Sequence, residues 1–201
     1  MQDSGTIRAI GHLTIVDKDT GEILLSKKNA IHFGNLAAAI VSALAGQDNG
    51  HVRYMAFGNG GTRVTAEGEI IYREPNVSII RNPDDSLYNE TFKKEIDNTL
   101  QNKIEVILGS TNFSDLKVTT TLAYDEAGLQ QQIIDRAPSF AEDNKDSSVF
   151  DEIALYVGPP SIAGNLDQSE AIMITHVIFH PIQKSSNRAL QIQYTVRVQM
   201  G

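Results

Sequence analysis

The chain has 201 residues, of which 41% are hydrophobic, so it can bury a sizeable core and is not expected to be disordered. It contains neither cysteine nor tryptophan, which excludes disulfides and thiolate metal sites. The formal net charge of -8 and the scattered Lys and Arg residues argue against nucleic-acid binding, which needs a basic patch. The polar N-terminus does not read as a signal peptide, and the longest apolar stretch is about half a membrane span, so we expect no membrane insertion.

Short strands are predicted along most of the chain. Residues 7–16 and 22–26 flank a run of turn-forming residues at 17–21, which predicts a β-hairpin. Further strands are expected where apolar and β-branched residues alternate or cluster between turn-forming residues. In chain order these segments are 52–57, 69–73, 77–80, 88–96, 103–108, 116–124, 149–157, 171–180 and 189–200.

An alanine-rich helix is predicted over residues 36–44, because larger apolar residues recur there at i, i+4 and i+8. Gly46 follows as the expected C-cap, and Asn29 or Asn35 is the expected N-cap. A second, short helix is predicted over residues 125–137, although a glycine inside it lowers its helix propensity.

The last two predicted strands have the clearest patterns. Residues 171–180 are almost continuously apolar or β-branched, as expected of a strand that is buried on both faces. Residues 189–200 alternate strictly between apolar side chains and polar ones, so one face of this strand should be buried and the other polar. The connection at 181–188 is polar, and we predict that the two strands form an antiparallel hairpin.

Together these segments predict a mainly β fold. We expect an antiparallel β-sandwich, jelly-roll-like in its organisation, with the alanine-rich helix packed on it. No shift in composition and no internal repeat marks a domain boundary. Residues 1–201 are therefore expected to form one domain with a short flexible N-terminus.

The glycine cluster Gly58-Asn59-Gly60-Gly61 follows a predicted strand, which is where nucleotide-binding loops lie. Arg63 stands where a dinucleotide-binding fingerprint needs glycine, and neither a Gly-Lys-Ser/Thr sequence nor a helical pattern follows. We interpret the cluster as a tight turn in which Gly58 and Gly60 adopt positive φ angles.

Two segments contain residues that could bind a metal ion. Residues 17–22 have some of the acids of a calcium loop, but Gly21 and Lys28 occupy positions that need oxygen ligands, so we interpret the segment as a solvated turn. His176 and His180 are four residues apart on a predicted strand, which separates them by about 13 Å. One zinc ion cannot bridge that distance, so we interpret them as ordinary side chains.

No catalytic group is recognisable from spacing. Asp151 and Glu152 are neighbours on a predicted strand, so they should point to opposite faces and not work as a pair. No Gly-x-Ser-x-Gly sequence and no cysteine nucleophile occurs. The sequons at Asn76, Asn89 and Asn112 are interpreted as chance. We therefore expect no catalytic, cofactor or metal site and no enzymatic activity; a hydrolase whose acids meet only in the folded chain is the least favoured alternative.

Four segments occur in a distinctive order. They are Asn29-Ala30 ahead of the alanine-rich helix, residues 54–62, residues 150–156 and the final strand pair with Lys184 and residues 191–198. In this order they resemble a family of tailed-bacteriophage structural proteins, which includes tail-collar or fibre-attachment modules and virion proteins of T4-like cyanophages. The resemblance covers roughly residues 25–199, and Ala154 departs from it where the family often has glycine.

The resemblance implies a non-enzymatic virion structural protein, assembled in the host bacterial cytoplasm. It implies an adaptor or fibre-attachment piece in the tail, baseplate or neck, whose partners are other virion proteins and further copies of itself. At 201 residues the chain is too short for a long fibre. The alternatives are a capsid decoration protein on the head exterior and a receptor- or carbohydrate-binding β-sandwich, which would present clustered aromatic residues on a loop.

Overall fold

A computed structural model of the chain describes residues 5–109, 111–127, 147–160 and 171–201. The described residues are mainly β with one α-helix, which confirms the predicted fold class. The elements, in chain order, are β1 (Ile7–Asp17), β2 (Ile23–Ile31), α1 (Phe33–Leu44), a 3-10 turn (Asp48–Gly50), β3 (Val52–Gly58), β4 (Thr62–Val64), β5 (Ile70–Tyr72), β6 (Glu90–Glu95), β7 (Asn102–Leu108), β8 (Phe113–Leu122), β9 (Ser147–Val157), β10 (Ile172–Met173), β11 (Thr175–Ser185) and β12 (Leu190–Met200).

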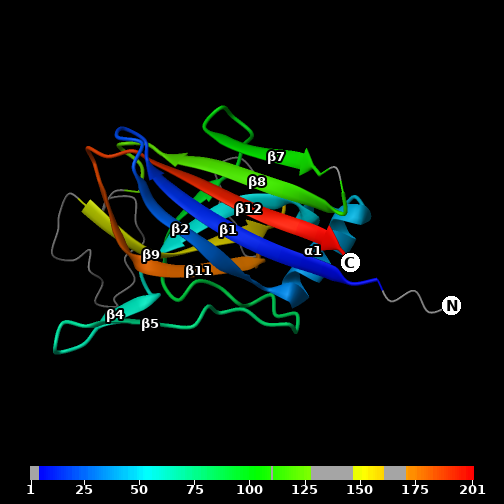
Figure 1. Cartoon of the computed structure of the whole chain (residues 1–201), viewed down its shortest axis with the longest axis horizontal. Helices are drawn as coiled ribbons and strands as arrows, with labels where there is room; N and C mark the ends of the chain where they lie inside the picture. The colour runs from blue at the N-terminus through cyan, green and yellow to red at the C-terminus, as the bar shows by residue number, and fades with distance from the viewer. Residues whose placement is uncertain (1–4, 110, 128–146, 161–170) are drawn as a thin grey trace.

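One antiparallel sheet contains ten of the described strands, in the order β6-β3-β9-β11-β2-β1-β12-β8-β7, with β10 paired to β9. Strands β4 and β5 form a separate two-stranded ribbon. The large sheet curls, so that β1 and β12 lie in front of β3 and β9 (Figure 1). This arrangement is consistent with a β-sandwich-like fold, in which both layers come from one continuous sheet.

The core lies between the two layers of the curled sheet. Leu13, Val118 and Tyr194 from one layer and Phe57 and Leu155 from the other are each at most 1% exposed. The alternation of β12 is confirmed, because Leu190, Ile192, Tyr194 and Val196 are buried in this core, whereas the polar residues between them are only half-buried. Burial of these side chains is the main favourable contribution to folding.

The predicted hairpin between the last two strands is wrong. β11 pairs with β9 and β2, whereas β12 pairs with β1 and β8, so the β1–β2 hairpin separates them in the sheet. β12 pairs with β1 over the full length of both strands, from Ile7–Met200 to Asp17–Leu190. This long ladder buries one face of β12 and leaves the other polar, whereas β11 needs cover on both faces.

Residues 73–89 provide part of that cover and are called the strap below. The strap is irregular, so the strand predicted over 77–80 is not formed. It runs along the lower side of the molecule in Figure 1, next to β11. The Asn76 N–H group donates to the His176 side chain of β11, which places the strap against that strand.

Helix α1 begins at Phe33, three residues before its predicted start. The N-cap is His32, whose Nδ1 accepts the N–H of Asn35 at 3.2 Å, so neither predicted asparagine caps the helix. At the other end Gly46 has a φ of 71°, which confirms its predicted role as the C-cap.

The helix predicted over 125–137 lies largely outside the described residues. Within the part of the chain that the structure describes, no helix is long and apolar enough to span a membrane.

Candidate functional site

His176 anchors the strap from β11. Its side chain is fully buried; Nδ1 accepts the N–H of Asn76 at 2.9 Å and Nε2 lies 3.0 Å from Glu152 Oε2. Because Nδ1 faces a backbone donor it must be an acceptor, so Nε2 carries the proton and donates to Glu152. The ring of Tyr88 packs on the imidazole with centroids 5.7 Å apart. His176 therefore binds the strap at two places.

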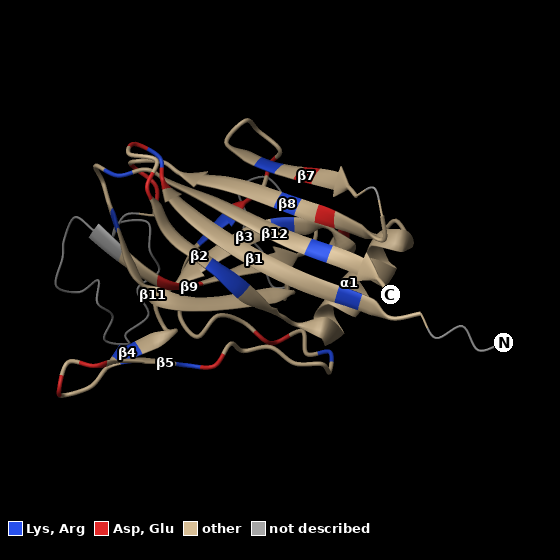
Figure 2. Cartoon of the chain, viewed as in Figure 1, with Lys and Arg blue, Asp and Glu red and all other residues tan. Residues whose placement is uncertain are grey.

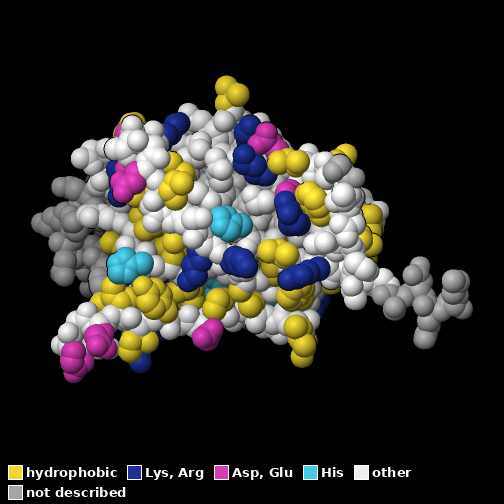
Figure 3. Space-filling model, viewed as in Figure 1, with side chains coloured by type: hydrophobic (Ala, Val, Ile, Leu, Met, Phe, Trp, Pro, Cys, Tyr) yellow, Lys and Arg dark blue, Asp and Glu magenta, His cyan; other side chains and the backbone are white. Residues whose placement is uncertain are grey.

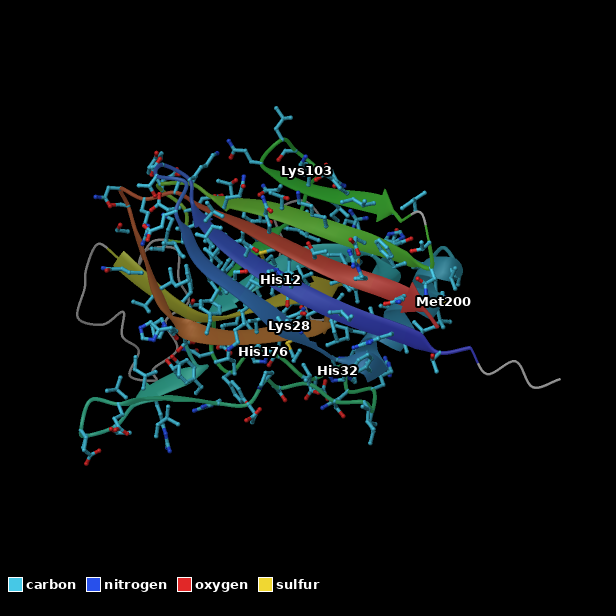
Figure 4. The ribbon with its side chains drawn as sticks, in the orientation of Figure 1. His12, Lys28, His32, Lys103, His176 and Met200 are labelled. Atoms are coloured by element: carbon cyan, nitrogen blue, oxygen red, sulfur yellow. The ribbon has the colours of Figure 1, made fainter. Side chains whose placement is uncertain are left out.

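His32 repeats the same arrangement at a different part of the strap. It too is fully buried, and its Nδ1 accepts a backbone N–H, that of Asn35, while Nε2 donates to Asp85 Oδ2 at 2.7 Å. Both histidines lie on the side of the sheet that faces the strap (Figure 4). Each imidazole thus joins a backbone donor on one side to a carboxylate on the other.

Glu152 of β9 is fully buried and accepts four hydrogen bonds. Besides His176, the donors are the N–H groups of Gly60 at 3.0 Å, Tyr88 at 3.0 Å and Asn89 at 2.8 Å. Burial alone would raise the pKa of Glu152, but the bonds from His176 and the backbone donors hold this pKa below its ordinary value. One carboxylate therefore joins the strap to the loop that follows β3.

Asp151, the neighbouring residue, is also fully buried and binds the same loop. It accepts the N–H of Gly61 at 2.9 Å and both the N–H and the hydroxyl of Thr62, at 2.8 and 2.5 Å. Burial, with a contribution from the Glu152 carboxylate, raises the pKa of Asp151 to about 6. Although they are neighbours on β9, Asp151 and Glu152 bind consecutive N–H groups of one loop. The expectation that they do not act as a catalytic pair stays a prediction.

The glycine cluster is a turn between β3 and β4, as predicted. The predicted reason for its glycines is wrong, because Gly58 and Gly60 are needed for close packing and not for a positive φ angle. Gly58 and Gly60 are not among the residues with positive φ. A Cβ atom on Gly58 would lie 2.4 Å from the carbonyl oxygen of Asn89, and one on Gly60 would lie 2.7 Å from its nitrogen. Both positions therefore need glycine so that the loop can pack against the end of the strap.

The acidic turn between β1 and β2 stabilises the hairpin by its own hydrogen bonds. Asp17 Oδ1 accepts the N–H groups of Asp19 and Thr20, and Oδ2 pairs with Arg188 Nε at 2.6 Å. These bonds, with that from Thr20 the largest cause, lower the pKa of Asp17. This confirms the turn interpretation of residues 17–22.

The two neighbouring histidines have separate partners. His176 binds Glu152 and the strap, whereas His180 is exposed and lies 3.1 Å from the hydroxyl of Tyr72. Among the described residues no group of three metal-binding side chains occurs.

The asparagines of the three sequons donate from their side-chain amides to neighbouring residues: Asn76 to Ser86, Asn89 to Asn59 and Asn112 to Met200.

The acids and histidines thus form an internal anchor. Their hydrogen bonds end on the backbone and side chains of two loops, and a buried carboxylate is stable only when it is bonded in this way. Sequence spacing did not indicate the anchor. The available signal was the pair of acids within the apolar strand 149–157, since acids that the strand pattern buries need nearby donors.

Large apolar side chains gather at one end of the molecule. The exposed apolar residues of α1, of the adjoining part of the strap and of the paired ends of β1 and β12 (Figure 1) are called the apolar end below. In the view of Figure 3, apolar side chains at this end are interspersed with basic and other polar ones. The members of the apolar end are between 46% and 84% exposed, and they are Ile7, Phe33, Val41, Leu44, Ile79, Ile80 and Met200. Apolar groups gathered in this way are typical of interaction surfaces.

Buried polar groups position the apolar end. The Asn35 side chain donates to the carbonyls of Asn82 at 2.8 Å and Met173 at 2.9 Å, and it accepts the N–H of Asn82 at 2.9 Å. Gly34 lies against the strap backbone, where a Cβ atom would come within 2.3 Å of Ile80 and Arg81. Asn35 and Gly34 therefore place the strap directly on α1.

A groove of about 450 Å³ opens beside this surface. It runs between residues 8–11 of β1, residues 28–31 of β2 and residues 77–79 of the strap, and Phe33 lines it at the helix. The basic segments of β1 and β2 border it (Figure 2). The groove combines an apolar floor with positive charge at its edge.

Comparisons of the chain with protein families, with curated proteins and with solved structures find no match. The resemblance to tailed-phage structural proteins therefore stays a prediction.

Proposed function

We propose that this protein is a non-enzymatic structural component of a tailed-phage virion, in the tail, baseplate or neck region, where it serves as an adaptor or fibre-attachment piece. The apolar end is the surface through which it binds a neighbouring virion protein. The observation that carries this proposal is the orientation of α1. The helix buries Asn35 and Ala39 and exposes Val41 and Leu44, at 66% and 84%.

An ordinary surface helix buries its large apolar residues and exposes polar ones. Here Leu36 packs partly against the core, but Val41 and Leu44 are left in water. Exposing large apolar side chains forgoes about 25 cal/mol for each Å² of apolar surface left in water. A partner that covers Val41, Leu44 and Ile80 would recover that free energy. The polar anchors at His32 and Asn35 fix the surface in advance, so little ordering is needed on binding.

The test is incorporation into particles. Virions of the phage that encodes the chain are purified from cells that carry either the natural gene or the double variant Leu44→Lys with Ile80→Lys. The chain is then quantified in the particles by mass spectrometry. We expect the double variant to be incorporated at least about tenfold less, since charges on an apolar contact cost more than 1.4 kcal/mol.

The matched control is Leu100→Lys, because Leu100 is 97% exposed and is not part of the apolar end. It should be incorporated normally. The proposal fails if the natural chain is absent from purified virions, or if the double variant is incorporated as well as the control.

A further inference from the structure

Strand β7 ends the large sheet and has one partner among the described strands, β8. The register between them runs from Asn102–Thr120 to Leu108–Ser114. The other edge of β7 is therefore open to pairing with a further strand. An open edge presents a row of N–H and C=O groups that another chain can bind.

The backbone groups that face this open edge can be identified. Just beyond the strand, the Gly109 N–H donates to the Phe113 carbonyl of β8, at 3.1 Å. In an antiparallel ladder alternate residues point to the same neighbour, so the odd-numbered residues of β7 bond to β8 and the even-numbered ones face outward. Ile104 agrees with this, since its N–H donates to the Asn98 side chain at 3.1 Å and not to β8.

Two outward-facing N–H groups have no acceptor among the described residues: those of Val106 and Leu108. The side chains around them are also uncovered. Val106, Ile107 and Leu108 are 68%, 48% and 79% exposed, so three consecutive apolar residues lie on an open strand edge. Natural sheets usually protect such an edge with charge, proline or a covering segment.

We propose that this edge pairs with the same edge of a second copy of the chain, antiparallel and with the two-fold axis at Ile107. This inference rests on the assembly role proposed above and names one of its partners. In this register Val106 lies opposite Leu108 of the second copy. The free N–H and C=O groups of both residues then bond to each other, and the three exposed apolar side chains of each strand cover those of the other.

Charge and existing hydrogen bonds favour this register over its neighbours. A pairing centred on Glu105 would place that carboxylate opposite its own copy, which is destabilising. It would also need the N–H of Ile104, which Asn98 already accepts. Centred on Ile107, the pairing places Glu105 opposite Gly109 and brings no like charges together. A second copy suits the edge because the same two residues supply every donor and acceptor.

The experiment uses charge at the two-fold axis, where Ile107 faces itself. The natural chain and the variants Ile107→Lys and Ile107→Glu are compared by sedimentation over a concentration series. We expect the natural chain to dimerise and each variant alone to dimerise at least about tenfold more weakly, since like charges then face each other. An equimolar mixture of the two variants should dimerise again, because opposite charges then meet. Leu100→Lys, the exposed control, should dimerise normally.

A second measurement does not depend on any variant. Amide hydrogen exchange of the natural chain should slow at Val106 and Leu108 as the concentration rises, while the exposed amide of Leu100 keeps its rate. The inference is overturned if the natural chain is a monomer at every concentration, if the mixture of variants does not recover, or if these two amides stay unprotected in the dimer.

This test separates the two proposals. A monomer in solution that is still incorporated into virions overturns self-pairing and leaves the virion role intact. In that case, protection of Val106 and Leu108 only within particles would assign the edge to a strand of another virion protein. A dimer that is absent from virions overturns the proposed function alone.

Discussion

At the scale of single residues, Glu152 connects distant parts of the chain. It accepts donors from the loop after β3, from the end of the strap and from β11, so three segments meet at one carboxylate. Hydrogen bonds to a charged acceptor are about twice as strong as neutral ones. The same bonds make the residue hard to replace, because the donors lose their acceptor and His176 remains fully buried.

Replacing Glu152 with alanine is therefore expected to lower the free energy of unfolding by at least about 3 kcal/mol, since it leaves the three backbone donors and His176 without an acceptor. Urea unfolding of the natural chain and the variant measures the difference. Glu105→Ala is the matched control: Glu105 lies on β7 with its side chain 40% exposed, and its loss should cost no more than about 0.5 kcal/mol. Equal losses at the two positions would contradict the anchor described here.

Asp151 should make stability depend on pH in the opposite direction to an ordinary paired acid. Its pKa is raised from 3.8 to about 6 in the folded chain, so the folded state binds its proton more tightly than the unfolded state. The resulting stabilisation is complete below pH 3.8 and is lost as the pH rises through about 6. At about 1.4 kcal/mol for each pKa unit, the loss between pH 4.5 and pH 7 is about 2 kcal/mol.

Asp151→Asn removes this titration. The stability difference between the natural chain and the variant should therefore shrink by about 2 kcal/mol between pH 4.5 and pH 7. Urea unfolding at both pH values measures this, and carbon NMR of the Asp151 carboxyl group reports the pKa directly. A carboxyl that titrates at or below its ordinary value would rule out the predicted dependence.

At the scale of elements, α1 and the strap form one unit. The helix approaches the strap backbone at Gly34, and Asn35 and His32 bond to the strap from either side of that contact. The local sequence pattern predicts the C-terminal end of the helix and its C-cap but not this contact, because Asn82 and Asp85 of the strap are 47 and 53 residues from Asn35 and His32. His32 was missed as the N-cap because histidine is not among the residues that usually cap helices.

Gly34→Ala tests the contact. A Cβ atom would meet backbone atoms at 2.3 Å, so either the strap or the helix must move. Overpacking of this kind costs about 1–3 kcal/mol, which exceeds the gain of up to about 1 kcal/mol that alanine brings to a helix. Thermal unfolding should show the loss. Gly5→Ala is the control, because a Cβ atom there meets nothing within 4 Å; a stabilised Gly34→Ala variant would show that the strap does not pack as described.

At the scale of the whole molecule, one core joins the two layers of the curled sheet. Leu13 lies in the layer of β1 and β12, and Leu155 lies in the layer of β3 and β9; both are fully buried in the same cluster. Because each layer covers the other, neither should remain folded when the other unfolds.

Leu13→Ala and Leu155→Ala should each lower the free energy of unfolding by about 2–5 kcal/mol and shift one shared transition. Circular dichroism and tyrosine fluorescence, followed in urea, should give coincident curves for both variants. Two separate transitions would show that the layers fold independently, and they would contradict the prediction that residues 1–201 form a single domain.

The sequence by itself determined the features that depend on neighbours along the chain. The mainly β character, the hairpin at its start, the alanine-rich helix and the two-faced pattern of β12 all follow from local periodicity and turn residues. The tertiary structure decided which strands are adjacent, and so separated β11 from β12. It also decided that Asp151, Glu152 and His176 share one anchor, and that α1 turns Val41 and Leu44 outward. These features depend on contacts between residues many tens of positions apart, which the folded sheet alone brings together, and local pattern carries no information about such distances.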